Sequence, residues 1–210
     1  ECVDILYNAF DKADEYRIPV MILGDGMLGQ IMEAVTLPEM KDVSKLPEKK
    51  WAATGKNTGK NRRIINSLYI EPDELESLNR KLFDRYALIA ERETKYEEYL
   101  CDDAEIVLTA YGTVARIAKS AVNILRENGI KAGLLRPITL YPFPSKAFLE
   151  VANRPSVRRF VCSELSMGQM IEDVKLAVEG KKPVDFYGRT GGNVMTPEDI
   201  VEFVRTEVLK

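Results

Sequence analysis

The second half of the chain alternates short apolar runs with amphipathic helical stretches, and this alternation limits the possible folds more than any other feature. The apolar runs have the length and continuity of buried parallel strands, and they lie at residues 104–110, 130–135, 157–163 and 184–187. Helical periodicity covers residues 112–128, 145–152 and 168–178, and a capping box with proline at the first helical position opens a last helix at residues 196–199. Short connections of this kind predict a mainly parallel sheet with right-handed crossovers and helices on both faces. We therefore expect an α/β fold over residues 102–210, built as a three-layer α/β/α sandwich.

The beginning of the chain predicts a separate α-β-α fragment over residues 1–36. An amphipathic helix is expected at residues 2–17, a buried strand at residues 19–23 and a second helix at residues 24–35. A fragment of this size cannot form a core by itself. Because the sequence begins inside the first helical pattern, we interpret the chain as a segment of something longer.

The middle of the chain has a different texture. Residues 37–71 contain two prolines and a cluster rich in lysine, asparagine, glycine and threonine, which predicts a linker with little regular structure. A linker of this length usually crosses between domains or carries a function. A connecting helix is then expected over residues 72–101, with an apolar stripe on one face and a charged, solvated face opposite.

Composition excludes several kinds of chemistry. The chain has no histidine, so no Ser-His-Asp or Cys-His pair can be built from it alone. Its three cysteines lie far apart, which predicts no metal site and fits reduced thiols in the cytoplasm. A net charge of −3 predicts no nucleic-acid partner, and the absence of a long apolar run predicts no membrane partner.

Two glycine-rich segments partly match the sequence patterns of nucleotide-binding loops. Residues 24–29 follow the pattern GxGxxG, but the acidic residue expected about 20 positions later is missing, so a tight strand-to-helix turn is the better interpretation. Residues 55–61 have glycines one position too close for a phosphate loop, and asparagine stands where serine or threonine would bind magnesium. We interpret this second segment as a mobile basic loop or a subunit-contact loop.

The ends of the predicted strands hold the remaining polar candidates. Arg136 lies in a loop fixed by three prolines, where it can recognise a carboxylate or phosphate, or pair with a neighbouring carboxylate to hold the turn. Glu164 follows another strand and can act as an acid or base, or pair with Arg136. No complete catalytic set is present.

Four segments together resemble the 2-oxoacid:ferredoxin oxidoreductases. They are TAYGTVA at 109–115, LLRPITLYPFP at 134–144, ELSMGQM at 164–170 and FYGRTGG at 186–192. Within that family they resemble the subunit that pairs with the thiamine-pyrophosphate subunit, and GDGMLGQ at 24–30 is most similar to the branched-chain (2-ketoisovalerate) type. The resemblance implies a transketolase C-terminal-like domain over residues 102–210, preceded by the end of a pyrimidine-binding domain at 1–36.

The resemblance also implies a function for the parent complex. Such a complex oxidatively decarboxylates a 2-oxoacid, here branched-chain 2-ketoisovalerate, to acyl-CoA and CO2 and reduces ferredoxin. Its thiamine pyrophosphate, magnesium and iron–sulfur clusters are expected in a thiamine-binding subunit and a ferredoxin-type subunit, and none of them in this segment. We expect this segment to assemble subunits and shape one wall of the site, without catalytic or metal-binding residues of its own. The candidates for an active-site or subunit interface are Asp25, Gly26, Gln30, Arg136 and Glu164. The alternative is a non-catalytic assembly module of a transketolase-like 2-oxoacid dehydrogenase complex.

Overall fold

The computed structural model describes residues 1–210 except for 47, 54 and 56–62, and it divides into two compact units. The sheet unit consists of residues 24–30 and 89–210, and the helical unit consists of residues 1–23 and 31–88. The glycine-rich loop expected at 55–61 lies almost entirely outside the described residues. No helix in the described part of the chain is long and apolar enough to cross a membrane.

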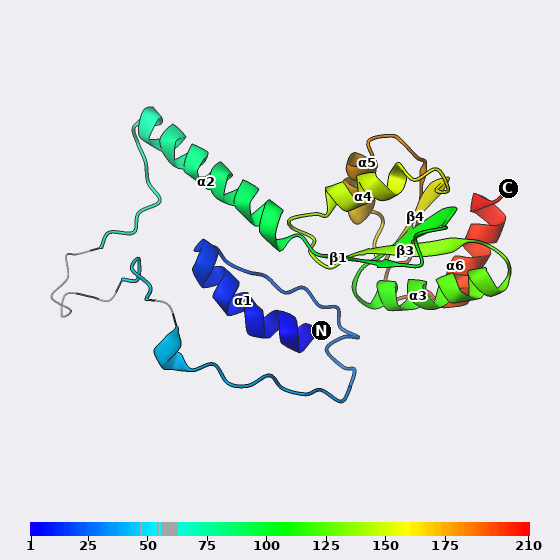
Figure 1. Cartoon of the computed structure of the whole chain (residues 1–210), viewed down its shortest axis with the longest axis horizontal. Coiled ribbons are helices and arrows are strands. Elements are labelled where there is room, and N and C mark those ends of the chain that lie inside the picture. The colour runs from blue at the N-terminus through cyan, green and yellow to red at the C-terminus, as the bar shows by residue number, and fades with distance from the viewer. Residues whose placement is uncertain (47, 54, 56–62) are drawn as a thin grey trace. The chain divides into compact units, whose positions relative to one another are not determined.

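The sheet unit is a five-stranded sheet between two helical layers (Figure 1). Its strands are β1 (Tyr96–Tyr99), β2 (Ile106–Thr109), β3 (Ala132–Pro137), β4 (Arg159–Glu164) and β5 (Val184–Gly188), in the spatial order β1-β3-β2-β4-β5. All neighbouring strands are parallel except β1, which runs antiparallel to β3. The three-layer α/β/α sandwich expected over residues 102–210 is therefore confirmed.

Each face of the sheet has its own apolar cluster. Helices α3 (Gly112–Glu127) and α6 (Pro197–Phe203), with the short π-helical turn η3 (Val204–Val208), cover one face, which we call the α3 face. Helices α4 (Ser145–Ala152) and α5 (Met170–Val178) cover the other, which we call the α5 face. Helix α6 begins with the expected capping box, in which Thr196 and Asp199 each accept the other's backbone amide. These two layers leave the carboxyl ends of the parallel strands at one edge of the sheet.

The antiparallel strand β1 replaces the end of the expected connecting helix. Helix α2 (Pro72–Glu93) stops before it, and residues 96–99 alternate between more and less exposed side chains with the period of a strand. Glu97 lies opposite Arg136 and faces α3, where it also pairs with Lys119, whereas Glu98 pairs with Arg154. These pairs and the free edge of β3 favour a strand over another helical turn, so the sheet is mainly parallel, as expected, with one antiparallel strand at its edge.

The helical unit contains α1 (Cys2–Tyr16), the single turn η1 (Val43–Lys45) and most of α2. Lys41 and Lys49 lie beside α1, with their ammonium groups 2.5 Å from Asp11 and 2.7 Å from Asp14. Tyr16 is the one buried apolar side chain among the described residues of this unit. The unit therefore has almost no apolar core.

Neither the strand expected at residues 19–23 nor the helix expected at 24–35 is present. The apolar side chains at 20–23 are between 41% and 80% exposed, and residues 26–30 form turns. The physical reason is that a strand forms only where another strand accepts its hydrogen bonds. The prediction of a buried strand at residues 19–23 is therefore wrong for this structure.

Gly133 is required by the close approach of the chain before β2. A Cβ atom at this position would lie 2.7 Å from the carbonyl oxygen of Leu100 and 3.0 Å from the Cα and Sγ atoms of Cys101. We expect Gly133→Ala to lower the free energy of unfolding of the chain by about 2 kcal/mol, because the backbone must shift to relieve the contact. Urea unfolding followed by circular dichroism measures this. Gly26→Ala is the control, since its Cβ would meet nothing within 4 Å, and equal midpoints for the two variants would contradict the prediction.

Candidate functional site

The carboxyl ends of β2 and β4 mark the place where an α/β sheet normally binds its ligand. The two strands are neighbours, but β2 leads into α3 on one face of the sheet and β4 leads into α5 on the other. Where two connections diverge in this way, they leave a crevice between them that is lined by two helix N-termini. Helix N-termini attract anions because their first backbone N–H groups have no partner within the helix.

The N-terminus of α5 is filled by the chain's own carboxylate. Glu164 is the last residue of β4 and only 1% exposed. Its Oε1 accepts the amide of Ile171 at 2.9 Å, and its Oε2 accepts the amides of Gln169 and Met170 at 3.0 Å each. The Ser166 hydroxyl donates to Oε2 at 2.9 Å. Glu164 therefore caps the helix in place of Gln169, the N-cap residue, which makes no such side-chain bond.

These contacts decide the ionisation of Glu164. Burial opposes the charged form, but the three backbone amides and the Ser166 hydroxyl outweigh it, so the pKa of this carboxyl lies below its usual value. The same charge acts on its neighbours. Burial first, and the nearby Glu164 charge second, raise the pKa of both Cys162 and Tyr111. A cysteine with a raised pKa remains a thiol and is a poor nucleophile.

The N-terminus of α3 carries a second carboxylate, supplied by a distant part of the chain. The N-cap residue Tyr111 makes no side-chain capping bond, and Gly112, the first residue of the helix, has a φ of +57°. Asp25 lies there, with its Oδ2 3.9 Å from the place where a Cβ of Gly112 would be. The Thr113 side chain, and then the Leu28 amide that donates to Oδ1 at 2.8 Å, lower the pKa of Asp25.

The other two candidates in this turn, Gly26 and Gln30, make no side-chain contact with the described residues that would suit them for a site. The turn is closed by the Gly29 amide on the Asp25 carbonyl and by the Gln30 amide on the Met27 carbonyl. Gly26 and Gln30 are both exposed. Of the three candidates at 24–30, the structure brings only Asp25 to the edge of the sheet.

Arg136 is confirmed as an intrachain partner at the end of a strand. It lies in β3, and its Nε is 3.0 Å from Oε2 of Glu97 on the neighbouring strand β1. It does not pair with Glu164, because β2 separates the two strands and the two side chains point to opposite faces of the sheet. The sequence interpretation that paired Arg136 with a neighbouring carboxylate was correct, with Glu97 as the partner.

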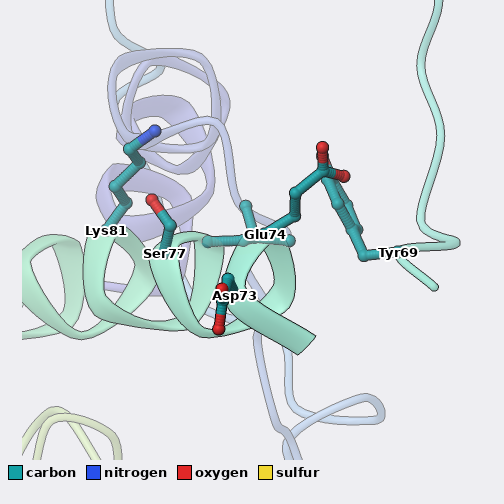
Figure 2. Close-up of a pocket in the computed structure, with 6 residues that line it drawn as sticks. Tyr69, Asp73, Glu74, Ser77 and Lys81 are labelled. Atoms are coloured by element: carbon teal, nitrogen blue, oxygen red, sulfur yellow. The ribbon is translucent and has the colours of Figure 1, made fainter. Parts of the chain in front are cut away.

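A shallow groove of about 500 Å³ lies elsewhere, along the first turns of α2. Its lining residues are Tyr69, Asp73, Glu74, Ser77, Leu78 and Lys81. Figure 2 shows Glu74, Ser77 and Lys81 on one side of the helix and Asp73 directed to the other. The charged groups do not converge, and apart from Tyr69 and Leu78 the lining side chains are well exposed, so the groove offers no catalytic or metal-binding arrangement.

The described polar residues at the edge of the sheet therefore stabilise the fold and do not form a catalytic or ligand-binding site. Both helix N-termini that could receive a phosphate already hold carboxylates, and a second anion would be repelled. Within the described ranges, no group of three or more Cys, Asp and Glu side chains could hold a metal ion. Sequence reasoning missed the roles of Thr113 and Ser166. Only Ser166 had a signal, because it stands between a strand-end glutamate and a glycine that precedes a helix.

The sequence of the chain is similar to subunits of known oxidoreductases. Residues 104–200 match the model for the pyruvate:ferredoxin oxidoreductase core domain II. Ketoisovalerate oxidoreductase subunit VorB of Methanothermobacter marburgensis is 46% identical over 206 residues, which are 98% of this chain and 57% of that protein. The 2-oxoglutarate synthase subunit KorA of Methanothermobacter thermautotrophicus is 28% identical over 228 residues, covering 97% of this chain and 60% of that protein. The chain thus spans little more than half the length of these relatives.

A solved structure shares the fold. The 2-oxoglutarate:ferredoxin oxidoreductase from Magnetococcus marinus, solved with 2-oxoglutarate, coenzyme A and succinyl-CoA bound, superimposes with a TM-score of 0.66. The match covers 93% of this chain and 38% of that one, at 17% sequence identity. At that identity the likeness concerns the fold alone.

We expect Glu164→Gln to lower the free energy of unfolding at pH 7 by about 3 kcal/mol, because a single amide oxygen cannot accept all the buried donors. The folded state lowers the pKa of Glu164, so its stabilisation is present above the unfolded pKa of about 4.3 and is lost as the pH falls below it. The difference between wild type and variant should therefore shrink below about pH 4. Denaturant unfolding across this pH range tests it. Glu172→Gln, an exposed carboxylate in the first turn of the same helix, should show neither effect.

We expect Asp25→Asn to weaken the attachment of residues 24–30 to α3 by about 1 kcal/mol, since an amide interacts less favourably with a helix N-terminus than a carboxylate. Hydrogen–deuterium exchange should speed up at residues 24–30 and at the first turn of α3. Asp42→Asn is the matched control, because Asp42 caps the separate turn η1. Unchanged exchange at residues 24–30 in Asp25→Asn would show that the carboxylate does not hold this turn.

Proposed function

We propose that the chain belongs to the 2-oxoacid:ferredoxin oxidoreductase family and is part of the ketoisovalerate-type subunit of such a complex. The observation that carries the proposal is the 46% identity to a ketoisovalerate oxidoreductase subunit across 98% of the chain. Two 2-oxoglutarate synthase subunits are only 28% and 29% identical to the chain. This lower identity favours a branched-chain 2-oxoacid over 2-oxoglutarate as the substrate. The complex would convert it to acyl-CoA and CO2 with reduction of ferredoxin.

We assign assembly and the shaping of the site, and not catalysis, to this segment. When bound in the complex, thiamine pyrophosphate supplies the carbanion chemistry of decarboxylation, and iron–sulfur clusters carry the electrons away. The described residues do not fit the diphosphate and its magnesium, because the two helix N-termini at the sheet edge already carry Glu164 and Asp25. The cofactors therefore belong to a thiamine-binding subunit and a ferredoxin-type subunit, the proposed partners in the cytoplasm.

We propose that residues 1–36 are the end of a pyrimidine-binding domain, joined to the transketolase C-terminal-like domain at 102–210 by a linker at 37–71 and a connecting helix at 72–101. Two observations support this proposal. The apolar side chains at 20–23 are exposed, and Leu6 and Phe10 form an apolar stripe on α1 that is 53% and 71% exposed. Additional polypeptide of the full-length subunit would cover both.

A transketolase-like 2-oxoacid dehydrogenase complex is the weaker candidate. It shares the fold class, but it passes its acyl group to a lipoyl carrier and does not reduce ferredoxin. The identities above favour the ferredoxin-linked family.

We expect the full-length subunit, co-expressed with its thiamine-binding and ferredoxin-type partners, to reduce ferredoxin in the presence of 2-ketoisovalerate and coenzyme A. The value of kcat/KM should be higher for 2-ketoisovalerate than for 2-oxoglutarate. The isolated 210-residue chain should be inactive and should not bind thiamine pyrophosphate with magnesium in calorimetry. Micromolar binding to the isolated chain would place the cofactor site in the turn at 24–29, and activity that depends on a lipoyl carrier would favour the transketolase-like alternative.

A further inference from the structure

A short loop between β4 and α5 exposes an apolar side chain at the carboxyl edge of the sheet. We call residues 165–169 the Met167 loop. Met167 is 83% exposed and Leu165 is 36% exposed. Single exposed apolar residues are common on protein surfaces, so exposure alone does not indicate a contact.

The Met167 loop differs from an ordinary exposed loop because several of its residues are hydrogen-bonded to the buried Glu164 or to one another. The Ser166 hydroxyl donates to Glu164 and accepts the amide of Gly168 at 3.1 Å, while the amide of Gln169 donates to Glu164. Gly168 has a φ of +108°, which only glycine adopts readily. The side chain of Met167 is therefore presented by a backbone that has little freedom left to lose on binding.

A second loop lies directly against it and carries an unpaired cation. The amide of Arg189, just after β5, donates to the carbonyl of Glu164 at 3.1 Å. A Cβ on Gly188 would lie 2.5 Å from the carbonyl oxygen of Ser166, so the two loops touch through their backbones. Arg189 is exposed and has no ion-pair partner among the described residues. In contrast, five other arginines of the sheet unit pair with carboxylates: Arg126, Arg136, Arg154, Arg158 and Arg159.

The chemistry of this surface selects its ligand. A phosphate would need free backbone amides beside Arg189, but the amides at the start of α5 already donate to Glu164. A second copy of the chain would bring two arginines together, since residues 165–169 and 188–194 contain no Asp or Glu. An exposed methionine on a constrained loop, in contact with a loop that carries an unpaired arginine, instead has the composition of a protein–protein interface.

From these contacts we infer that Met167 and Arg189 form a docking point for a different protein subunit, which presents an apolar pocket to Met167 and a carboxylate to Arg189. The inference rests on the proposed function. The occupant is the thiamine-binding subunit, because both loops follow the carboxyl ends of parallel strands, β4 and β5, at the edge where we propose that this segment forms one wall of the site. Leu165 and Val194, which is 37% exposed, would border the contact.

The test measures binding of the full-length subunit to the thiamine-binding subunit by titration calorimetry. Met167→Glu and Arg189→Glu should each raise Kd by about tenfold or more, because one buries a charge and the other reverses the complementary one. Leu176→Glu and Arg205→Glu are the matched controls. Leu176 is exposed on α5 and Arg205 on η3, both away from the two loops, and these variants should bind like wild type.

The outcomes separate the two proposals. If the wild-type subunits bind but both loop variants bind equally well, the docking point is wrong while the proposed function stands. If the wild-type subunits form no complex at all, the proposed assembly fails and the docking point fails with it. If ultracentrifugation shows that the wild type forms homodimers and that Met167→Glu is monomeric, the occupant is a second copy, and the inference of a different subunit is overturned.

Discussion

The buried carboxylate of Glu164 is the interaction on which the edge of the sheet depends. One side chain at the end of β4 accepts the first amides of α5 and fixes the hydroxyl of Ser166. A charge buried to this extent is stable only when several donors surround it, so removing any one of them weakens the rest. The helix start and the loop before it are thus held by a single anion.

Asp25 repeats this solution at α3, with a carboxylate that comes from the first part of the sequence. In many α/β proteins the same two positions bind the phosphates of a cofactor. Here the fold keeps the helices and the divergent connections but uses internal anions to stabilise them. A domain of this kind is suited to presenting rigid surfaces, which agrees with the proposed role in assembling a larger enzyme.

Much of the sheet unit could be predicted from sequence because its signals are local. The capping box at Thr196 and the alternation of apolar runs with helical stretches each depend on residues close together in the chain. Strand β1 was missed because it exists only through its pairing with β3, far along the sequence, and the strand expected at 19–23 was wrong for the converse reason. For the candidate site, the pairing of Arg136 with a nearby carboxylate could be predicted from its proline-fixed loop. The contact of Asp25 with α3 had no local signal, since it joins distant segments.

Strand β1 also determines whether this edge of the sheet can pair with a strand of another molecule. It is an edge strand of only four residues, and its two central residues are glutamates on opposite faces, held by lysine and arginine partners. Short, charged edges discourage another chain from adding a strand. The free backbone donors and acceptors on the outer edge of β1 are therefore a poor template for pairing with a strand of another molecule. A protein that assembles with other subunits, as we propose for this chain, avoids in this way a route to aggregation, and recognition falls to its loops and helices.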